Sequence, residues 1–330
     1  MQDNSRPEFG VLLLQMGGPE TLDDVGPFIK AMLSDKNIMD MCPAARLPLA
    51  NLIATFRAPR SKRQYQAIGG GSPIGSITQA QADALAKSIA EFGKSVPVRV
   101  GMRYTTPSIA DGVKSLVKQG VETIVALPLH PQWSKATTGS AFDVVKQVVD
   151  SMDCPPAVIY IDEWAKEPGY IHAVADSIKE ALAQIPAQEL HKTRVLFSAH
   201  GLPESYVKRG DPYQVHVCRT VDAVMDVLDM PELSVVTTYQ SRMGPVKWLS
   251  PSTSDQIQAA AGEGYSSLVI VPITFVSDHL ETLYEINIAY RDLAAKAGVK
   301  HFVPAASLNE SPTFIEALTR LVYRAVTLPK

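Results

Sequence analysis

Short apolar runs alternate with amphipathic segments along nearly the whole chain, and this alternation restricts its fold more than any other feature. Continuous apolar runs are typical of strands buried on both faces, and helical segments between them are typical of parallel sheets. The sequence therefore predicts an α/β fold with doubly wound, Rossmann-like parallel sheets. The expected strands are Val11–Leu14, Val98–Met102, Thr123–Leu127, Ala157–Ile161, Arg194–Phe197, Ser234–Thr238 and Leu268–Val271, and the expected helices are Ile77–Phe92, Pro107–Gln119, Tyr170–Gln184, Tyr213–Leu228, Ser252–Gly262 and Pro312–Val326.

The sequence also repeats itself. Residues 11–20 (VLLLQMGGPE) line up with residues 195–204 (VLFSAHGLPE), and residues 120–128 line up with residues 264–272. Because the matches occur in the same order, they predict two similar domains. We expect these over residues 1–170 and 171–330, facing each other across an interdomain cleft. We also expect the last helix, at residues 312–326, to pack back on the first domain.

The first half carries extra chain between its matching segments, and we place it at about residues 34–76. An apolar stretch, Leu47–Phe56, is followed there by a basic cluster at residues 57–63 and by a glycine run at residues 69–71. A surface helix with a solvated charged end is one interpretation. The other is a lip over an apolar ligand that touches an anionic membrane surface through residues 47–63.

Three carboxylates follow the last predicted strand. Asp278, Glu281 and Glu285 are spaced by three and four residues, which places them on one face of a helix. Asp278 and Glu281 also match a capping pair, which satisfies the first N–H groups of a helix. A cap explains neither Glu285 nor the neighbouring His279, so the segment is a candidate site for chemistry.

A second candidate is His200, which ends a strand and precedes Gly201. In the repeat its position is matched by Met16, so one half has an apolar side chain where the other has a base. Such a pair of walls suits a large flat ligand, although a lone histidine is also a common structural cap. His200 and Glu281 together would offer a divalent metal one nitrogen and one oxygen ligand, which makes an open site that releases its ion.

Composition and missing motifs exclude several classes of function. The net charge of -3 gives no support to a nucleic-acid partner. Residues 1–10 lack the pattern of a signal peptide, and no apolar run approaches the ~20 residues of a membrane span. Cys42, Cys154 and Cys218 form no C-x-x-C pair, and phosphate-loop and nucleophile-elbow patterns are missing. We therefore expect a cytoplasmic protein.

Several motifs together resemble those of ferrochelatase, the lyase that inserts ferrous iron into a porphyrin in haem biosynthesis. The resemblance covers about residues 9 to 326 and implies a two-lobed, chelatase-type fold with the porphyrin in the interdomain cleft. The motifs that carry it are SAHGLP at 198–203, GDPY at 210–213, YQSRMGP at 239–245, FVSDHLETLYE at 275–285, LQMGGP at 14–19, GMRY at 101–104 and TTGS at 137–140.

The resemblance also implies roles for the metal-handling residues. His200 matches the family's essential histidine, which is a metal ligand or accepts a pyrrole proton. Glu281 matches the glutamate that faces it. Asp278, His279 and Glu285 match an acidic path for iron delivery or proton removal.

A further group matches the residues that line the porphyrin. It comprises Met16, Arg103, Tyr104 and Trp248, with Gln15 beside Met16 as a further substrate contact. Met16 is apolar where relatives that use coproporphyrin often have a tyrosine. This difference favours protoporphyrin IX as the substrate.

Iron is expected as a substrate, with no permanently bound cofactor. Some ferrochelatases hold a [2Fe–2S] cluster on cysteines, but this sequence has none after Cys218, and Lys135 stands where such relatives can have one. We therefore expect no cluster. The alternatives are a coproporphyrin III ferrochelatase, another tetrapyrrole chelatase such as a cobalt chelatase for sirohydrochlorin, and a tetrapyrrole carrier without catalysis.

Overall fold

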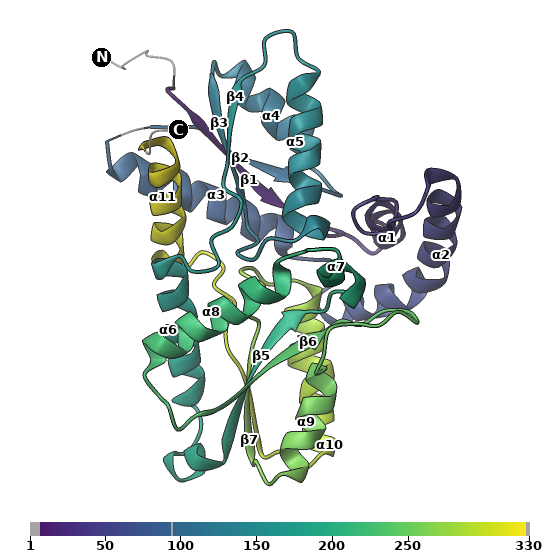
Figure 1. Ribbon diagram of the computed structural model, residues 1–330, viewed down its shortest axis with the longest axis vertical. Helices are drawn as coiled ribbons and strands as arrows, with labels where there is room; N and C mark the ends of the chain where they lie inside the picture. The colour runs from purple at the N-terminus through teal and green to yellow at the C-terminus, as the bar shows by residue number, and fades with distance from the viewer. Residues whose placement is uncertain (1–6, 94, 328–330) are drawn as a thin grey trace. The chain divides into compact units, whose positions relative to one another are not determined.

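A computed structural model describes residues 7–93 and 95–327 and contains two four-stranded parallel sheets, ordered β2-β1-β3-β4 and β6-β5-β7-β8 (Figure 1). The predicted α/β fold with parallel sheets is confirmed. The chain divides into two compact units. Unit 1 runs to Trp164 and resumes at Phe314, whereas unit 2 is Ala165–Thr313.

Helices cover both faces of the unit 1 sheet, with α4 and α5 on one side and α3 and α11 on the other (Figure 1). Leu12 and Leu14 of the central strand β1 pack with residues of α4 and α5, so a buried apolar layer joins sheet and helices. The strands are β1 (Gly10–Gln15), β2 (Val98–Met102), β3 (Thr123–Pro128) and β4 (Ala157–Tyr160). The helices are α1 (Val25–Leu33), α2 (Pro43–Ala67), α3 (Ile74–Glu91), α4 (Ile109–Lys118), the π-helix η1 (Lys135–Gly139), α5 (Ser140–Asp150) and α11 (Pro312–Thr327).

The last helix, α11, belongs almost entirely to unit 1. Its Thr319 hydroxyl donates to Ser88 of α3 at 2.9 Å, and its Tyr323 hydroxyl donates to the carbonyl of Ile89 at 3.1 Å. Phe314 lies with its ring centroid 6.0 Å from that of Trp164. Unit 2 is therefore an insertion between two parts of unit 1 in chain order.

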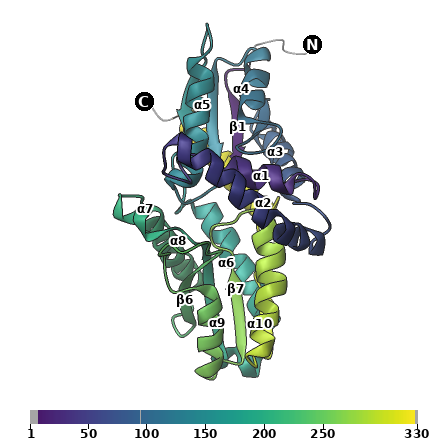
Figure 2. The same cartoon turned by 90° about the vertical axis from the view of Figure 1, so that its right-hand side faces the viewer.

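Unit 2 has the same plan, with α6 and α8 on one side of its sheet and α9 and α10 on the other (Figures 1 and 2). Leu196 of β5 and Ile270 of β7 pack with apolar residues of α9, η3 and α10. Its strands are β5 (Thr193–His200), β6 (Ser234–Gln240), β7 (Ser267–Val271) and β8 (His301–Pro304). Its helices are α6 (Pro168–Leu182), the 3₁₀-helix η2 (Ala187–Lys192), α7 (Glu204–Lys208), α8 (Tyr213–Leu228), α9 (Thr253–Gly262), the π-helix η3 (Glu281–Tyr290) and α10 (Arg291–Lys296).

The internal repeat seen in the sequence corresponds to equivalent positions in the two sheets. β1 and β5 are the central strands, each paired in parallel on both sides. Ser108 and Ser252 cap equivalent helices, since each hydroxyl accepts an N–H, from Asp111 or Asp255, at 3.1 Å. A π-helix follows the third strand of each unit.

Two features differ from the sequence prediction. The short edge strand β8 was not predicted, because only Phe302 among its four residues is buried and four residues give little periodicity. The carboxylate helix is a π-helix over Glu281–Tyr290, and Asp278 lies before it. The expectation that Asp278, Glu281 and Glu285 share one α-helical face is therefore wrong.

The extra segment of unit 1 forms the 25-residue helix α2. Its Ala50, Ala54, Ser61 and Tyr65 are buried, so one face packs on the unit. α2 ends at Ala67, before glycines 69 and 70, whose φ values are 108° and 98°. The glycine run therefore forms the turn into α3, since L-residues rarely adopt such angles. Among the described residues, no helix is both long and apolar enough to span a membrane.

We expect Gly112→Ala to destabilise unit 1. A Cβ at Gly112, on the face of α4 against the sheet, would lie 2.6 Å from Leu12 Cδ1 and 2.8 Å from the carbonyl oxygen of Val100. Such overpacking costs about 1–3 kcal/mol, which exceeds the gain of up to about 1 kcal/mol from replacing a helical glycine.

The matched control is Gly262→Ala in α9, where no heavy atom lies within 4 Å of the added Cβ. Thermal unfolding followed by circular dichroism should show a lower midpoint for Gly112→Ala and an equal or higher one for Gly262→Ala. A Gly112→Ala protein as stable as the wild type would contradict the close packing of α4 on β2.

Candidate active site

His200 is the last residue of β5, and its backbone is fixed on both sides. Its N–H donates to the Thr274 hydroxyl at 3.1 Å, and its carbonyl accepts from the Tyr213 hydroxyl at 2.8 Å. The half-buried imidazole lies edge-on to the Phe275 ring, with centroids 5.9 Å apart. The strand end thus holds the histidine in one place, where ligands bind in sheets of this type.

The residue after His200 must be a glycine. A Cβ at Gly201 would lie 2.5 Å from the carbonyl oxygen of Gln240 and 3.2 Å from the Trp248 ring. Trp248 is half-buried and donates from its indole nitrogen to the carbonyl of Met243 at 3.0 Å. Because Gly201 has no side chain, the backbone after His200 can pass close to the Trp248 ring, and the two predicted residues lie near each other.

His279 lies between two acceptors. Its Nδ1 is 3.0 Å from the carbonyl oxygen of Ser277, and its Nε2 is 2.7 Å from a carboxylate oxygen of Glu281. A carbonyl and an ionised carboxylate only accept hydrogen bonds, so both ring nitrogens must carry protons. The contacts therefore define His279 as an imidazolium paired with the Glu281 anion.

The pair shifts both titrations away from their ordinary ranges. Burial lowers the pKa of His279, but the charge and hydrogen bond of Glu281 outweigh burial and raise it. Burial raises the pKa of Glu281, but the charge and hydrogen bond of His279, with a contribution from His200, hold it at about 2. Glu281 is therefore ionised throughout the physiological range, on a side chain that is 27% exposed.

Asp278 is tied to the loop that precedes α11. Its carboxylate accepts hydrogen bonds from the Thr282 hydroxyl at 2.9 Å, the Ser307 hydroxyl at 2.7 Å and the Asn309 amide at 3.0 Å. The Asn309 side-chain oxygen accepts the backbone N–H of Asp278 in return, at 2.9 Å. These side-chain contacts give Asp278 a structural role different from the capping pair that its spacing with Glu281 suggested.

Glu285 holds the end of β6 against η3. Its carboxylate accepts from the Gln240 amide at 3.1 Å, from the backbone N–H of Ser241 at 3.0 Å, from the Ser241 hydroxyl, and from the Tyr290 hydroxyl at 2.9 Å. Ser241 has a φ of 62°, a conformation that costs energy in a residue other than glycine. The Glu285 carboxylate therefore stabilises the turn that opens the loop carrying Trp248.

The predicted substrate-binding residues of unit 1 meet at the ends of β1 and β2. The backbone N–H of Arg103 donates to the carbonyl of Gln15 at 2.8 Å, and that of Tyr104 donates to the carbonyl of Met16 at 3.1 Å. The Gln15 side chain accepts the N–H of Met16 at 2.9 Å. The structure thus groups Gln15, Met16, Arg103 and Tyr104 in unit 1, and His200, Trp248 and the acidic segment in unit 2.

Asp35 is a member of the unit 1 group that sequence reasoning missed. It lies in the polar segment between α1 and α2, where no motif marks it, yet its side chain is only 2% exposed. One carboxylate oxygen accepts from Arg103 Nη2 at 2.8 Å, from the Tyr104 hydroxyl at 2.8 Å and from the Ser140 hydroxyl. Burial raises the pKa of Asp35, but these contacts and the Asn37 backbone N–H outweigh burial and lower it.

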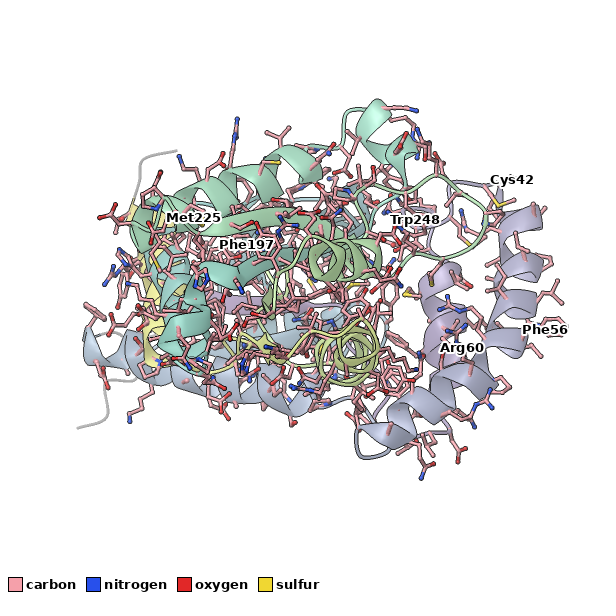
Figure 3. All side chains as sticks on the ribbon, turned by 90° about the horizontal axis from the view of Figure 1, so that it is seen from below. Cys42, Phe56, Arg60, Phe197, Met225 and Trp248 are labelled. Atoms are coloured by element: carbon pink, nitrogen blue, oxygen red, sulfur yellow. The ribbon has the colours of Figure 1, made fainter. Side chains whose placement is uncertain are left out.

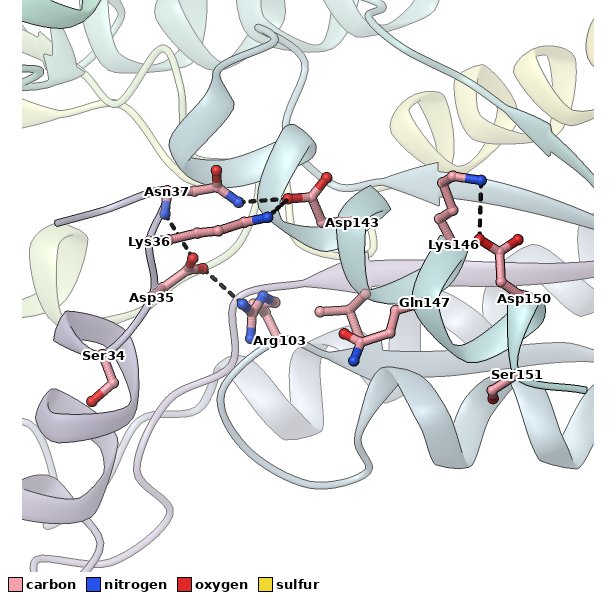
Figure 4. A pocket seen from close by; sticks show the side chains of 11 residues that line it. Ser34, Asp35, Lys36, Asn37, Arg103, Asp143, Lys146, Gln147, Asp150 and Ser151 are labelled. Atoms are coloured by element: carbon pink, nitrogen blue, oxygen red, sulfur yellow. Dashed lines mark hydrogen bonds and ion pairs between the residues drawn. The ribbon is translucent and has the colours of Figure 1, made fainter. Parts of the chain in front are cut away.

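An open pocket of about 640 Å³ lies beside this cluster (Figure 4). Asp35 and Arg103 line it on one side, and residues along α5 from Asp143 to its C-terminal end line it on another. Lys36 pairs there with Asp143 at 3.2 Å, and Lys146 pairs with Asp150 at 3.0 Å. Positive and negative side chains thus alternate around the pocket.

The described residues contain no group of three or more histidine, cysteine, aspartate or glutamate side chains arranged to hold a metal ion. The predicted metal pair, His200 and Glu281, is smaller than such a group. Its assignment as a metal site stays a prediction.

Comparison with known proteins identifies the family. A family model described as Ferrochelatase matches residues 8–326. The chain belongs to the ferrochelatase family. The ferrochelatase of Gloeobacter violaceus is 43% identical over 319 residues, covering 96% of this chain and 97% of that protein. The ferrochelatase of Geotalea uraniireducens is 42% identical over 318 residues, covering 96% and 98%.

Solved structures support the fold of this ferrochelatase family member. The structure of SirB from Bacillus subtilis with Fe3+ matches with a TM-score of 0.53 and 17% identity, covering 76% of this chain and 90% of that chain. The sirohydrochlorin chelatase SirB in complex with cobalt matches with a TM-score of 0.51 and 15% identity, covering 75% and 88%. The predicted chelatase-type fold is thereby confirmed.

We expect Glu281→Gln to lower the pKa of His279. The substitution removes the anion that stabilises the imidazolium, whereas burial still disfavours the charged ring. NMR titration of the His279 ring should show a lower midpoint in Glu281→Gln than in the wild type. Glu263→Gln, which changes an exposed carboxylate paired with Arg194, is the matched control and should leave that midpoint unchanged. An unchanged midpoint in Glu281→Gln would contradict the ion pair.

The pKa shifts of His279 and Glu281 also determine how the pair's contribution to the free energy of unfolding changes with pH. The pKa of His279 is raised from 6.5, so its contribution is complete below about pH 6.5 and is lost as the pH rises through the folded-state value. The pKa of Glu281 is lowered from 4.5 to about 2, so its contribution is complete above about pH 4.5 and is lost as the pH falls toward 2. The stability difference between wild type and Glu281→Gln should therefore be largest between about pH 4.5 and 6.5.

Proposed function

We infer that this protein is a ferrochelatase, a lyase-type metal chelatase of haem biosynthesis that inserts Fe2+ into protoporphyrin IX to form protohaem. The observation that carries this inference is the arrangement of His200 at the end of β5 with an ionised Glu281 on η3, in a chain of the ferrochelatase family. Metallation replaces two pyrrole N–H bonds by bonds to iron and releases two protons. The residues at the site must therefore take protons and hold a cation for a short time.

We assign Glu281 to the cation and His200 to a proton. A carboxylate with a pKa of about 2 is a weak base, so at neutral pH it binds a metal ion more readily than it removes a pyrrole proton. Imidazole is the stronger base of the two and can also act as a nitrogen ligand. The imidazolium of His279 donates to one carboxylate oxygen of Glu281 and keeps the carboxylate ionised.

Two protein ligands suit an ion that must be passed on, because a closed site with four ligands retains its metal. In this proposal Asp278 and Glu285 attract the cation toward Glu281 by their charge, since their oxygens are already engaged in hydrogen bonds. Binding also has to expose the nitrogen lone pairs of the porphyrin, which lie in the ring plane. Binding energy spent on bending the macrocycle would lower this barrier.

The porphyrin contacts on unit 1 are proposed to be Met16, Arg103, Tyr104 and Gln15, with Trp248 on unit 2. An apolar Met16 favours the less carboxylated protoporphyrin IX over coproporphyrin III. Assays with ferrous iron and each tetrapyrrole, including sirohydrochlorin with cobalt, separate these substrates. The interdomain cleft predicted to hold the porphyrin stays a prediction.

We expect His200→Ala to bind porphyrin but to lose metallation by roughly 10³-fold, within the usual range for losing a general base. Porphyrin fluorescence measures binding, and the absorbance change on metallation measures turnover. His172→Ala, which changes an exposed histidine of α6, is the matched control. Unchanged metallation in His200→Ala would overturn the assignment. A wild-type protein that binds protoporphyrin but never metallates it would instead support a carrier.

We further propose that iron is only a substrate and that the protein holds no [2Fe–2S] cluster or other permanent cofactor. Cys42, Cys154 and Cys218 are free, exposed and far apart in the sequence. Purified protein should contain no acid-labile sulfide, and finding it would contradict this proposal.

We also propose that the protein is cytoplasmic and contacts the inner face of the membrane through residues 47–63 of α2. Leu47 is 50% exposed, Leu52 is 53% exposed and Phe56 is 76% exposed. Figure 3 shows Phe56 on the outer side of α2, and Arg60 lies one turn further along the helix. Exposed apolar side chains next to basic ones are typical of helices that lie on anionic lipid. A substrate that partitions into lipid would reach the protein there.

We expect Phe56→Ser together with Leu52→Ser to reduce binding to vesicles that contain anionic lipid by about tenfold or more, because much of the exposed apolar area is lost. Co-sedimentation with vesicles measures this binding, and metallation in detergent should be retained. Val215→Ser, which changes an exposed valine of α8, is the matched control. Equal sedimentation of the double variant and the wild type would contradict membrane contact through α2.

A further inference from the structure

Asp35 connects the segment before α2 to two residues proposed to line the porphyrin. Its carboxylate oxygen Oδ2 accepts from Arg103, Tyr104 and Ser140, and its Oδ1 accepts the backbone N–H of Asn37 at 2.8 Å. Three donors converge on one oxygen of a side chain that is 2% exposed. Only an ionised carboxylate accepts all of them without offering a proton of its own.

These contacts fix the guanidinium of Arg103 in one orientation. Its Nη2 is 2.8 Å from Asp35, its Nε donates to the Ser140 hydroxyl at 2.7 Å, and its central carbon lies 4.7 Å from the centroid of the Tyr104 ring. Because the guanidinium is planar, two anchored nitrogens determine where the third points. Nη1 takes part in none of these contacts, and Arg103 lines the open pocket shown in Figure 4.

Tyr104 is oriented by the same carboxylate. Its hydroxyl donates to Asp35 at 2.8 Å, and its ring meets Phe28 of α1 edge-on at 6.4 Å. The aromatic ring and the guanidinium are thus held against each other before any ligand arrives. Preorganised side chains lose less conformational entropy on binding, which favours affinity.

We propose that Asp35 is a positioning residue for porphyrin binding, which sets the orientation of Arg103 and Tyr104 through their shared hydrogen bonds. The proposal rests on the proposed function, since it takes the tetrapyrrole as the ligand of these two side chains. All the described contacts of the Asp35 side chain are with other groups of the protein. It acts on the substrate through Arg103 and Tyr104.

The neighbouring Asp143 provides a matched control. It lines the same pocket and bonds to Lys36 and to the Asn37 amide, but its side chain is 53% exposed and it contacts neither Arg103 nor Tyr104 in these hydrogen bonds. Asp35→Asn and Asp143→Asn therefore remove the same charge from the same pocket. Only the first disturbs the orientation of the proposed porphyrin contacts.

The test measures kinetics for both substrates in the full-length protein. We expect Asp35→Asn to raise the KM for porphyrin about tenfold or more. The KM for Fe2+ should change less than twofold, and kcat should stay within about threefold of the wild-type value. The size follows from the range for a lost hydrogen bond to a charged group. A merely structural loss would reduce the active fraction and hence kcat, and would leave both KM values unchanged. Asp143→Asn should match the wild type in all three constants.

Ser140→Ala is a second variant in case Asp35→Asn does not fold. It removes the hydroxyl that joins Arg103 to Asp35 at the first residue of α5, where alanine suits the helix. Its KM for porphyrin should rise about threefold or more. In the double variant with Arg103→Lys the effect should not add to that of Arg103→Lys alone, because both act through the same side chain.

Direct binding of metal-free porphyrin separates the outcomes. Wild-type affinity for porphyrin in both folded variants, Asp35→Asn and Ser140→Ala, would overturn the positioning role and leave the ferrochelatase assignment intact. A wild-type protein that neither binds nor metallates porphyrin would overturn the proposed function itself.

Discussion

The imidazolium–carboxylate pair of His279 and Glu281 is the interaction on which the proposed chemistry of unit 2 depends. The carbonyl of Ser277 lies beside Nδ1, so Nε2 faces Glu281, whose charge and hydrogen bond outweigh burial and raise the pKa of His279. The glutamate is then ionised at any physiological pH, although it is partly buried. A lone carboxylate in this place would have a raised pKa and would offer a proton where a cation is proposed to bind. The main-chain oxygen of Ser277 thus orients the ring, and the two side chains of the pair keep each other charged.

The repeated α/β plan gives the two units equivalent strand ends with different chemistry. In unit 1 the end of β1 carries Met16 next to Arg103 and Tyr104, and its π-helix η1 has no carboxylate. In unit 2 the end of β5 carries His200, and η3 carries Glu281 and Glu285. Doubly wound sheets place ligands at these ends, so under the proposed function one plan used twice would supply both a substrate surface and a reacting surface.

The fold could be predicted from the sequence because buried parallel strands are marked by continuous apolar runs, and seven of these match observed strands. His200, Glu281 and their neighbours were predicted as site residues from their places after predicted strands and from motif resemblance, and their roles stay a proposal. The charge of His279 could not be predicted, since it depends on how closely the folded chain brings its ring to Glu281 and to the Ser277 carbonyl. Asp35 lies in a polar segment with no recognisable motif, and only the folded structure brings its carboxylate into contact with Arg103. The π-helix escaped prediction because ten residues do not separate its period from that of an α-helix.

The return of the chain to unit 1 in α11 affects how the protein is made. Phe314, Leu318 and Val322 are buried there, so the core of the first unit lacks part of its apolar surface until α11 is synthesised. Unit 2 is complete in sequence by residue 313. N-terminal domains usually fold first during synthesis, but here the N-terminal unit is the later of the two to have all of its residues. On the ribosome, the half that carries His200 and Glu281 is the first to have all of its parts.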